Sequence, residues 1–258
     1  MPALLIALSL IACRPPEAPD TFADMMVFGF VHFEDEEPDS LQSLGEKMIP
    51  WLDKHIEETQ EGYETAPMTP EDLVEAGVDA PDRSSIVGVA VGLDYTVGVD
   101  ALAGGISHPN QDEIFEIYID FEREDLTDRD CFLKRDCELH RTNDTLHSDV
   151  GLGIELWTEY KTNFRNVDLE DGTKLVLHQS VTNEPVEFNI DAIAVYQQYG
   201  FSLAWERDDG TARRAQAMWA DMELLDGDAG EGFHLSLTIN SMQNGAEDMD
   251  AFLNGETR

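Results

Sequence analysis

Residues 87–99 constrain the fold more than any other stretch, because their apolar side chains alternate with a period of two. Small or polar residues fill the even positions, and the odd positions hold Val87, Val89, Val91, Leu93, Tyr95, Val97 and Val99. Alternation of this kind predicts one long β-strand with a single buried face. Gly88, Gly92 and Gly98 on the opposite face are expected to let the strand curve or bulge.

Other segments carry strand signals of the same kind. Apolar or alternating runs predict strands over 25–34, 115–122, 154–165, 175–181, 190–206, 212–225 and 233–239. Asp171-Gly172 and Asp209-Gly210 have the composition of hairpin turns, and Gly200 is a candidate bend. Strands linked by hairpins tend to be neighbours in one sheet.

Two segments have helical spacing instead. Leu41, Leu44, Met48, Leu52 and Ile56 recur every three or four residues, with Pro50 as an expected kink. A second helix is expected over 69–77, where Thr69 can cap the start and Gly77 can end it. A last short helix is expected around 246–253.

These elements predict an α+β fold that is mainly β: a curved antiparallel meander of about seven to eight strands, with two helices inserted after the first strand. A β-barrel or a β-sandwich is the alternative. The element order is similar to that of helix-grip (START-like) domains, in which two helices after the first strand help to close a curved sheet. That family also has a long final helix across the sheet, whereas the strand expected at 233–239 leaves this chain only about ten residues for one. The resemblance is one of topology and carries over no residue.

The N-terminus shows a different resemblance. An apolar run from Ala3 leads through Leu10-Ile11-Ala12 into Cys13, and three prolines follow within 14–20. This order resembles the lipobox of bacterial lipoproteins. The resemblance implies a signal peptide at 1–12, a lipid on Cys13, a tether over 13–21 and a single domain over 22–258. It also implies an anchor in the bacterial cell envelope, with the outer membrane favoured over the inner, and a domain in the periplasm or on the cell surface.

The charge of the chain limits its partners. With 54 acidic and 16 basic residues, the formal net charge is −38, which repels nucleic acid and anionic headgroups. The acids are spread along the chain, which favours a solvated, salt-adapted surface over a dedicated cation-binding surface. The expected partners are the membrane, through the lipid, and either envelope proteins or an apolar small molecule.

Residues 123–150 lack periodicity and are expected to form a long loop. This loop holds Cys131 and Cys137, an even pair once Cys13 carries the lipid, and the pair is expected to form a disulfide outside the cytoplasm. The alternative is a zinc site made of Cys131, Cys137, His140 and His147, although these spacings are unusual for zinc.

Other candidate sites are better explained by structure. Asp226, Asp228 and Glu231 resemble part of a calcium loop but lack its remaining ligands, so a hairpin connection is favoured. The strand histidines at 32, 178 and 234 are interpreted as structural. No hydrolase, zinc-protease, phosphate-loop or dinucleotide motif occurs, so no cofactor and no catalytic residue is predicted.

Two functions remain. The first is a non-catalytic, lipid-anchored envelope protein that serves in structure or in protein contacts. The second is a binding module for a small apolar or lipid-like ligand, held in a cavity of roughly 300–1,000 Å³ between the helices of residues 39–77 and the sheet. An enzyme is the third possibility, and a strongly perturbed acid or histidine in a cleft would favour it.

Overall fold

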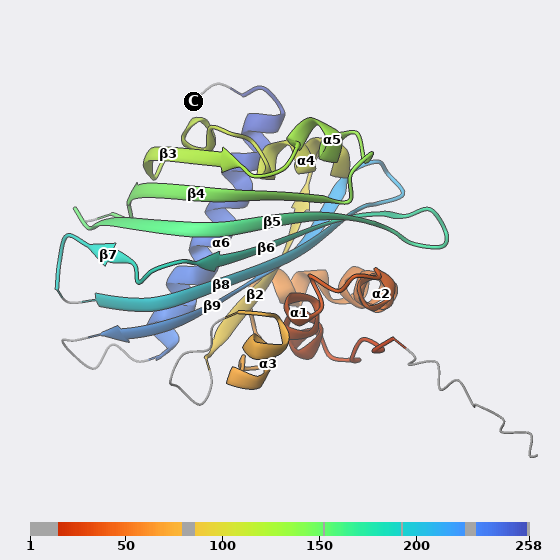
Figure 1. The fold of residues 1–258 in the computed structure, drawn as a ribbon, viewed down its shortest axis with the longest axis horizontal. Helices are drawn as coiled ribbons and strands as arrows, with labels where there is room; N and C mark the ends of the chain where they lie inside the picture. The colour runs from red at the N-terminus through yellow and green to blue at the C-terminus, as the bar shows by residue number, and fades with distance from the viewer. Residues whose placement is uncertain (1–14, 79–85, 152, 192, 225–230, 257–258) are drawn as a thin grey trace, which may run out of the picture.

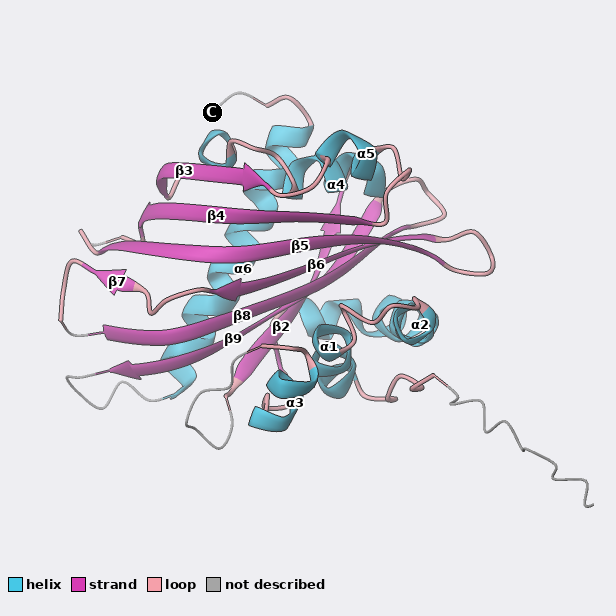
Figure 2. Cartoon of the chain, in the orientation of Figure 1, coloured by secondary structure: helices cyan, strands magenta, loops and turns pink. Residues whose placement is uncertain are grey.

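The computed structural model describes residues 15–78, 86–151, 153–191, 193–224 and 231–256. Within them the fold is α+β and mainly β, as predicted. One antiparallel sheet is strongly twisted and flanked by helices on both faces (Figures 1 and 2).

The sheet is an open meander. Its strands are β1 (Tyr63–Glu64), β2 (Gly88–Tyr95), β3 (Tyr118–Asp125), β4 (Leu139–Asp149), β5 (Glu155–Asp168), β6 (Lys174–Thr182), β7 (Glu187–Phe188), β8 (Ile193–Glu206) and β9 (Ala212–Leu224). Their order is β1-β2-β9-β8-β6-β5-β4-β3, with β7 paired to β5. Because β1 and β3 stand at opposite ends and do not pair, the described strands form neither of the alternatives, a closed barrel or a two-sheet sandwich.

Helices cover both faces of this sheet. They are α1 (Phe22–Val31), α2 (Asp39–Gln60), α3 (Pro70–Glu75), α4 (Val99–Ile106), the 3₁₀ turn η1 (Gln111–Glu113), α5 (Arg129–Leu133) and α6 (Glu231–Leu253). We call the face covered by α1, α2 and α3 the outer face, and the face against which α4 and α6 pack the inner face (Figure 1). None of the described helices has the length and hydrophobicity that a membrane crossing requires.

The long strand predicted at 87–99 is β2, but the prediction of a single buried face was wrong. The odd-numbered side chains join the inner core with α6, as expected. The small residues of the other face are buried too: Ala90 lies in the outer core, and Gly92 lies directly against Thr59 and Ile56 of α2. The glycines therefore allow a helix to approach the strand closely, and Gly98 caps the start of α4.

The segment 25–34, predicted as a strand, is mostly the helix α1. Thr21 caps it by accepting a hydrogen bond from the backbone N–H of Asp24. Nearly every side chain of α1 is buried, among them Phe22, Met25 and Phe30. A helix that is apolar all round shows no 3.6-residue period, so its sequence is indistinguishable from that of a buried strand.

The C-terminal prediction was also wrong. Residues 233–239 do not form a strand but belong to α6, which runs for 23 residues across the inner side of the sheet (Figure 1). Leu235, Ile239, Met242, Ala246 and Met249 are spaced by three or four residues and contact the inner core. The long final helix of helix-grip folds, which was not expected here, is therefore present.

The segment 123–150 is not a long loop. It contains the end of β3, the short helix α5 and the whole of β4, an eleven-residue strand. The strand predicted at 115–122 is found only from Tyr118, and the apolar residues at 117 and 119 are exposed, because the register shifts between Tyr118 and Asp120 and β3 lies at the sheet edge. Ile119 is 50% exposed there.

The predicted helix over 69–77 and the two hairpin turns are confirmed, but the kink predicted at Pro50 is not found there. The helix α2 continues through Pro50, and its non-helical backbone falls later, at His55. Thr69 and Asp72 form a capping box at the start of α3. Gly172 and Gly210 adopt φ values of 89° and 81° in the two predicted hairpin turns, a region that favours glycine.

Candidate ligand-binding site

The inner face of the sheet is unusually polar for a surface covered by a helix. The pairing register brings alternate residues of seven strands onto it. Its polar members are Tyr95, Tyr118, Arg123, His140, Thr142, Asp144, Ser148, Thr158, Tyr160, Thr162, His178, Ser180, Thr182, Gln198, Ser202, Arg214 and Gln216. Polar groups on an interior surface need hydrogen-bond partners, which the fold or a bound molecule must supply.

Part of this surface is satisfied by a buried ion pair. The guanidinium of Arg123 donates from Nε and Nη2 to the two carboxylate oxygens of Asp144, at 2.8 and 2.7 Å. Both side chains are about 5% exposed. The Thr162 hydroxyl donates to the same carboxylate at 2.8 Å, and Arg123 also donates to the carbonyls of Ile106 and His108 beyond α4. This network ties β3, β4, β5 and the α4 end together.

Other inner-face groups lie deep in the molecule and yet keep partly accessible surface. Burial raises the pKa of Tyr160 to about 12 and raises that of Tyr118 even more. Burial, assisted by the positive charges of Arg214 and Arg123, lowers the pKa of His178 well below 6.5, so this histidine is neutral. All three side chains remain in part accessible. Because these side chains keep some accessible surface, the centre of the inner face is not a fully closed core.

The inner face also holds buried polar atoms that make no hydrogen bond in the described part of the chain. They are Tyr95 Oη, Thr142 Oγ1, Ser148 Oγ, Thr158 Oγ1 and Arg214 Nε. Native interiors contain few such atoms, and ordered water or a bound molecule can supply the partner that the described chain does not.

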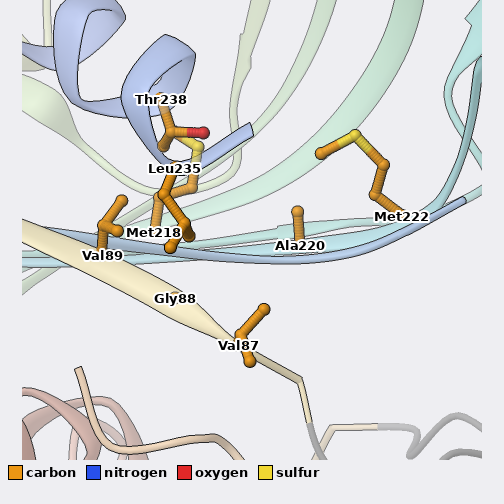
Figure 3. A pocket seen from close by; sticks show the side chains of 8 residues that line it. All are labelled: Val87, Gly88, Val89, Met218, Ala220, Met222, Leu235 and Thr238. Carbon is orange, nitrogen blue, oxygen red and sulfur yellow. The ribbon is translucent and has the colours of Figure 1, made fainter. Parts of the chain in front are cut away.

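A small cavity opens at the apolar end of this face, between β2, β9 and α6. It measures about 30 Å³. In Figure 3, Met218, Ala220 and Met222 project from β9 towards α6, while Leu235 projects from the helix towards the sheet. The inner face thus combines an apolar end with a polar centre.

The prediction of a cavity of roughly 300–1,000 Å³ between the helices of residues 39–77 and the sheet was wrong, because in the described part of the chain a filled apolar core occupies that place. On the outer face Leu41, Leu44 and Met48 of α2 are fully buried against the sheet, in a continuous apolar core. A separate hollow of about 400 Å³ lies at the surface between α1 and α3, bordered by Val27, Phe28 and Val31 and by carboxylates. Two of its carboxylates already bond to Thr21 and Thr69 as helix caps.

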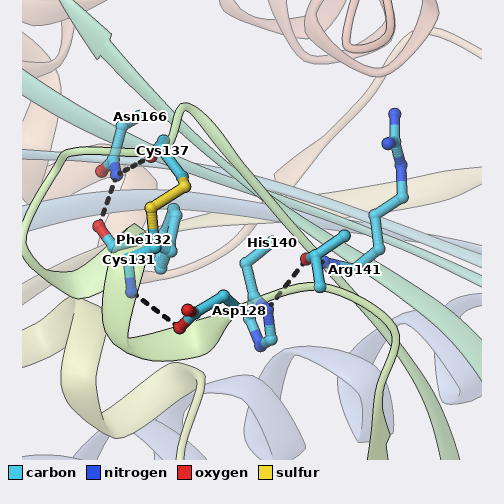
Figure 4. The surroundings of a disulfide bond; sticks show 8 residues. Asp128, Cys131, Phe132, Cys137, His140, Arg141 and Asn166 are labelled. Carbon is cyan, nitrogen blue, oxygen red and sulfur yellow. Dashed lines mark hydrogen bonds between the residues drawn. A yellow bond between two sulfur atoms is a disulfide. The ribbon is translucent and has the colours of Figure 1, made fainter.

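Cys131 and Cys137 are joined by a disulfide in the structure (Figure 4). Asp128 caps α5 by accepting a hydrogen bond from the backbone N–H of Cys131. The Asn166 side chain donates to the carbonyls of Phe132 and Cys137 at 2.9 and 3.3 Å (Figure 4). These two hydrogen bonds hold the segment closed by the disulfide against β5.

The alternative zinc set is not brought together. His140 is fully buried between Phe132 and Phe164, with Nε2 at 3.3 Å from a carboxylate oxygen of Asp125. His147 stacks on Trp157 and bonds to Glu155. The two histidines occupy opposite faces of β4, about 23 Å apart along the strand. Among the described residues no group of three His, Cys, Asp or Glu side chains forms a metal site.

The other predicted sites are placed as follows. His32 lies at the end of α1, not in a strand, and bonds to Asp35. His178 is in β6, as expected, on the inner face. His234 belongs to α6, not to a strand. Cys13 and most of the calcium-like segment, including Asp226 and Asp228, lie outside the described residues.

The sequence prediction missed the polar inner face because β4 was not recognised. A signal exists: His140, Thr142, Asp144, Leu146 and Ser148 alternate with exposed or half-buried residues. The alternating residues are mostly polar, so the usual apolar pattern of a half-buried strand is absent.

No protein-family model matches the chain, and no curated protein matches it. Among solved structures, similar chains include a START superfamily protein from Mycobacterium smegmatis, at 5% identity and a TM-score of 0.41, covering 66% of this chain and 99% of that one. Ara h 8.0201 shows 7% identity, a TM-score of 0.40 and coverage of 66% and 99%. The Zhui aromatase/cyclase from Streptomyces sp. R1128 shows 13% identity and a TM-score of 0.40, covering 66% of this chain and 93% of that one. Likeness of this degree carries no argument about function.

The structure therefore defines a class of fold: a curved antiparallel sheet with a long C-terminal helix packed against one face. The inner face of this sheet is the candidate ligand-binding surface.

Proposed function

We propose that this protein is a binding module for a small, partly apolar ligand, held between the inner face of the sheet and α6. The observation that supports this most is the set of deep but partly accessible polar groups, above all His178 and Tyr160. Ligand sites in proteins are typically concave and mostly apolar, with a few well-placed polar groups. The methionine-lined end and the polar centre of this face fit that description.

Binding is favoured over catalysis by the state of His178. A general base at neutral pH needs a pKa near 7, and the pKa of this histidine is well below 6.5. A neutral imidazole remains a good hydrogen-bond partner for a polar group of a ligand.

The location of the protein is a separate proposal. The resemblance of residues 1–13 to a lipoprotein signal supports a lipid on Cys13 and a place in the cell envelope. A ligand-binding domain on a tether of prolines would then work close to a membrane surface. Mass spectrometry of the protein from its native host tests this, since an intact Met1 without an acyl group would contradict it.

A larger side chain in the cavity between β9 and α6 tests the binding proposal. Ala220 lines the cavity between β9 and α6, so Ala220→Phe should reduce the affinity for an apolar fluorescent probe such as N-phenyl-1-naphthylamine by roughly tenfold or more. Ile119→Phe, at the exposed sheet edge, is the matched control and should leave the affinity unchanged.

Native mass spectrometry before and after delipidation gives an independent reading. Retained small-molecule mass, or probe binding that Ala220→Phe weakens, supports the proposal. Absence of both retained mass and probe binding contradicts it.

A further inference from the structure

Two neighbouring arginines on β9 have opposite environments. Arg213 faces the outer side, where it donates to Asp94 at 2.6 and 3.1 Å and to Asp53 at 2.7 Å. Arg214 faces the inner side and is only 7% exposed. Its Nε is buried without a hydrogen-bond partner, and no carboxylate of the described chain forms an ion pair with it.

The surroundings of Arg214 offer no compensation from within the sheet. Its direct neighbours in the register are Leu93 on β2 and Ala204 on β8, both apolar. The inner-face carboxylate of Asp144 is already held by Arg123. A guanidinium that is mostly buried and has no ion-pair partner in the described chain is unfavourable, which favours a partner from outside that chain.

The chemistry of the site specifies the missing partner. A guanidinium matches a carboxylate with two parallel hydrogen bonds. The single positive charge of Arg214 would be balanced by one negative charge on a ligand. Met218 and the rest of the apolar end lie along the same face of β9, ~13 Å from Arg214 for a four-residue separation.

We propose that the ligand is a monoanionic amphiphile, whose carboxylate pairs with Arg214 while its apolar chain extends along β9 towards Met218 and Leu235. This inference depends on the proposed binding function and adds the chemical class of the ligand. The overall charge of −38 does not oppose it, because exposed acids are screened within about 10 Å at 0.1 M salt, whereas contact with a buried guanidinium is not.

The test compares decanoate with decan-1-ol, two ligands with the same chain and different head groups. Both compete against N-phenyl-1-naphthylamine on the full chain, in the wild type and in the variants Arg214→Gln and Arg213→Gln. In the wild type, decanoate should displace the probe at a concentration at least roughly tenfold lower than decan-1-ol, because a hydrogen bond to a buried charge is lost with the alcohol. In Arg214→Gln this preference should disappear, and in Arg213→Gln it should remain.

The stability of the unliganded variants provides a second measurement. Arg214→Gln removes an uncompensated buried charge and should melt at a temperature equal to or above that of the wild type. Arg213→Gln leaves Asp94 and Asp53 without their partner and should melt lower.

The outcomes separate the two proposals. If neither compound displaces the probe and the probe itself does not bind, the binding function fails and this inference fails with it. If both compounds compete equally, or Arg214→Gln keeps the preference for decanoate, the binding function stands and the role of Arg214 is refuted.

Discussion

At the scale of single residues, polar side chains decide what the inner face of the sheet can do. Arg123 and Asp144 satisfy each other, and the arginine spans to backbone carbonyls beyond α4. His178 and the tyrosines are deep, neutral and in part accessible. Apart from Arg214, this combination gives a surface whose polar groups are neutral or paired and are still able to form hydrogen bonds.

The neutral state of His178 predicts a specific pH dependence of stability. Its folded-state pKa lies well below 6.5, and burial also lowers the pKa of His140. Below pH 6.5 the unfolded state therefore binds more protons than the folded state, so stability is lost as the pH falls, by up to about 1.4 kcal/mol per pH unit for each histidine.

Urea unfolding between pH 7.5 and 5.5 measures this loss. His178→Gln should make the free energy of unfolding less steep in pH over that window, and His140→Gln should act in the same direction. An unchanged slope in His178→Gln would mean that the folded-state pKa of this histidine is not lowered.

At the scale of elements, β2 is a strand that has a helix packed on each of its two faces. Its odd positions contact α6 and its small even positions contact α2. The alternation predicted the strand correctly. It did not reveal the second buried face, because glycine and alanine in a strand carry no signal of what packs on them.

The close approach at Gly92 gives a second prediction. A Cβ atom there would lie 2.5 Å from Thr59 Oγ1 and 2.8 Å from Ile56 Cδ1. Gly92→Ala should therefore destabilise the protein by about 1–3 kcal/mol, the usual effect of overpacking a core. Chemical denaturation measures the change.

Gly104 in α4 is the matched control for that substitution. A Cβ at Gly104 meets no atom within 4 Å, so Gly104→Ala should be neutral or stabilise the helix by about 0.5–1 kcal/mol. Equal effects of the two substitutions would contradict the contact between β2 and α2.

The errors at α1 and α6 have physical causes at the same scale. The residues of α1 are apolar on all sides, so no period distinguishes helix from strand. In α6, Phe233, Leu235, Leu237 and Ile239 happen to alternate, while the helical spacing appears only when the pattern is followed to Met249. Seven residues are too few to distinguish the strand period of two from the helix period of 3.6.

At the scale of the whole molecule, the dominant feature is the large negative net charge. The acids lie mostly on the surface, and the sheet is enclosed by helices on both faces (Figure 2). A net charge of −38 works against the compact state by self-repulsion. Salt screens this repulsion, with a Debye length that falls from about 10 Å at 0.1 M to about 3 Å at 1 M.

We therefore expect the melting temperature to rise steadily as NaCl increases from 0.1 to 1 M. Screening by ionic strength alone predicts that MgCl₂ gives the same rise at equal ionic strength. A much larger rise with micromolar Mg²⁺ would instead reveal a specific cation site, and a melting temperature independent of salt would contradict a repulsive surface.

The sequence by itself determined the class of this protein. Periods of two, hairpin turns with glycine and a capped helix suffice to predict a mainly β, antiparallel meander, because each of these signals is local. The same is true of the net charge and of the even pair Cys131 and Cys137.

The tertiary structure alone decided which surface forms the candidate site. Arg214 and Arg213 are adjacent in the sequence, and only the register of β9 between β2 and β8 places one against carboxylates and the other on the inner face. The polar residues of this candidate site come from seven strands, several of them distant in the chain. Their convergence depends on long-range pairing and on the position of α6, which no local pattern of residues encodes.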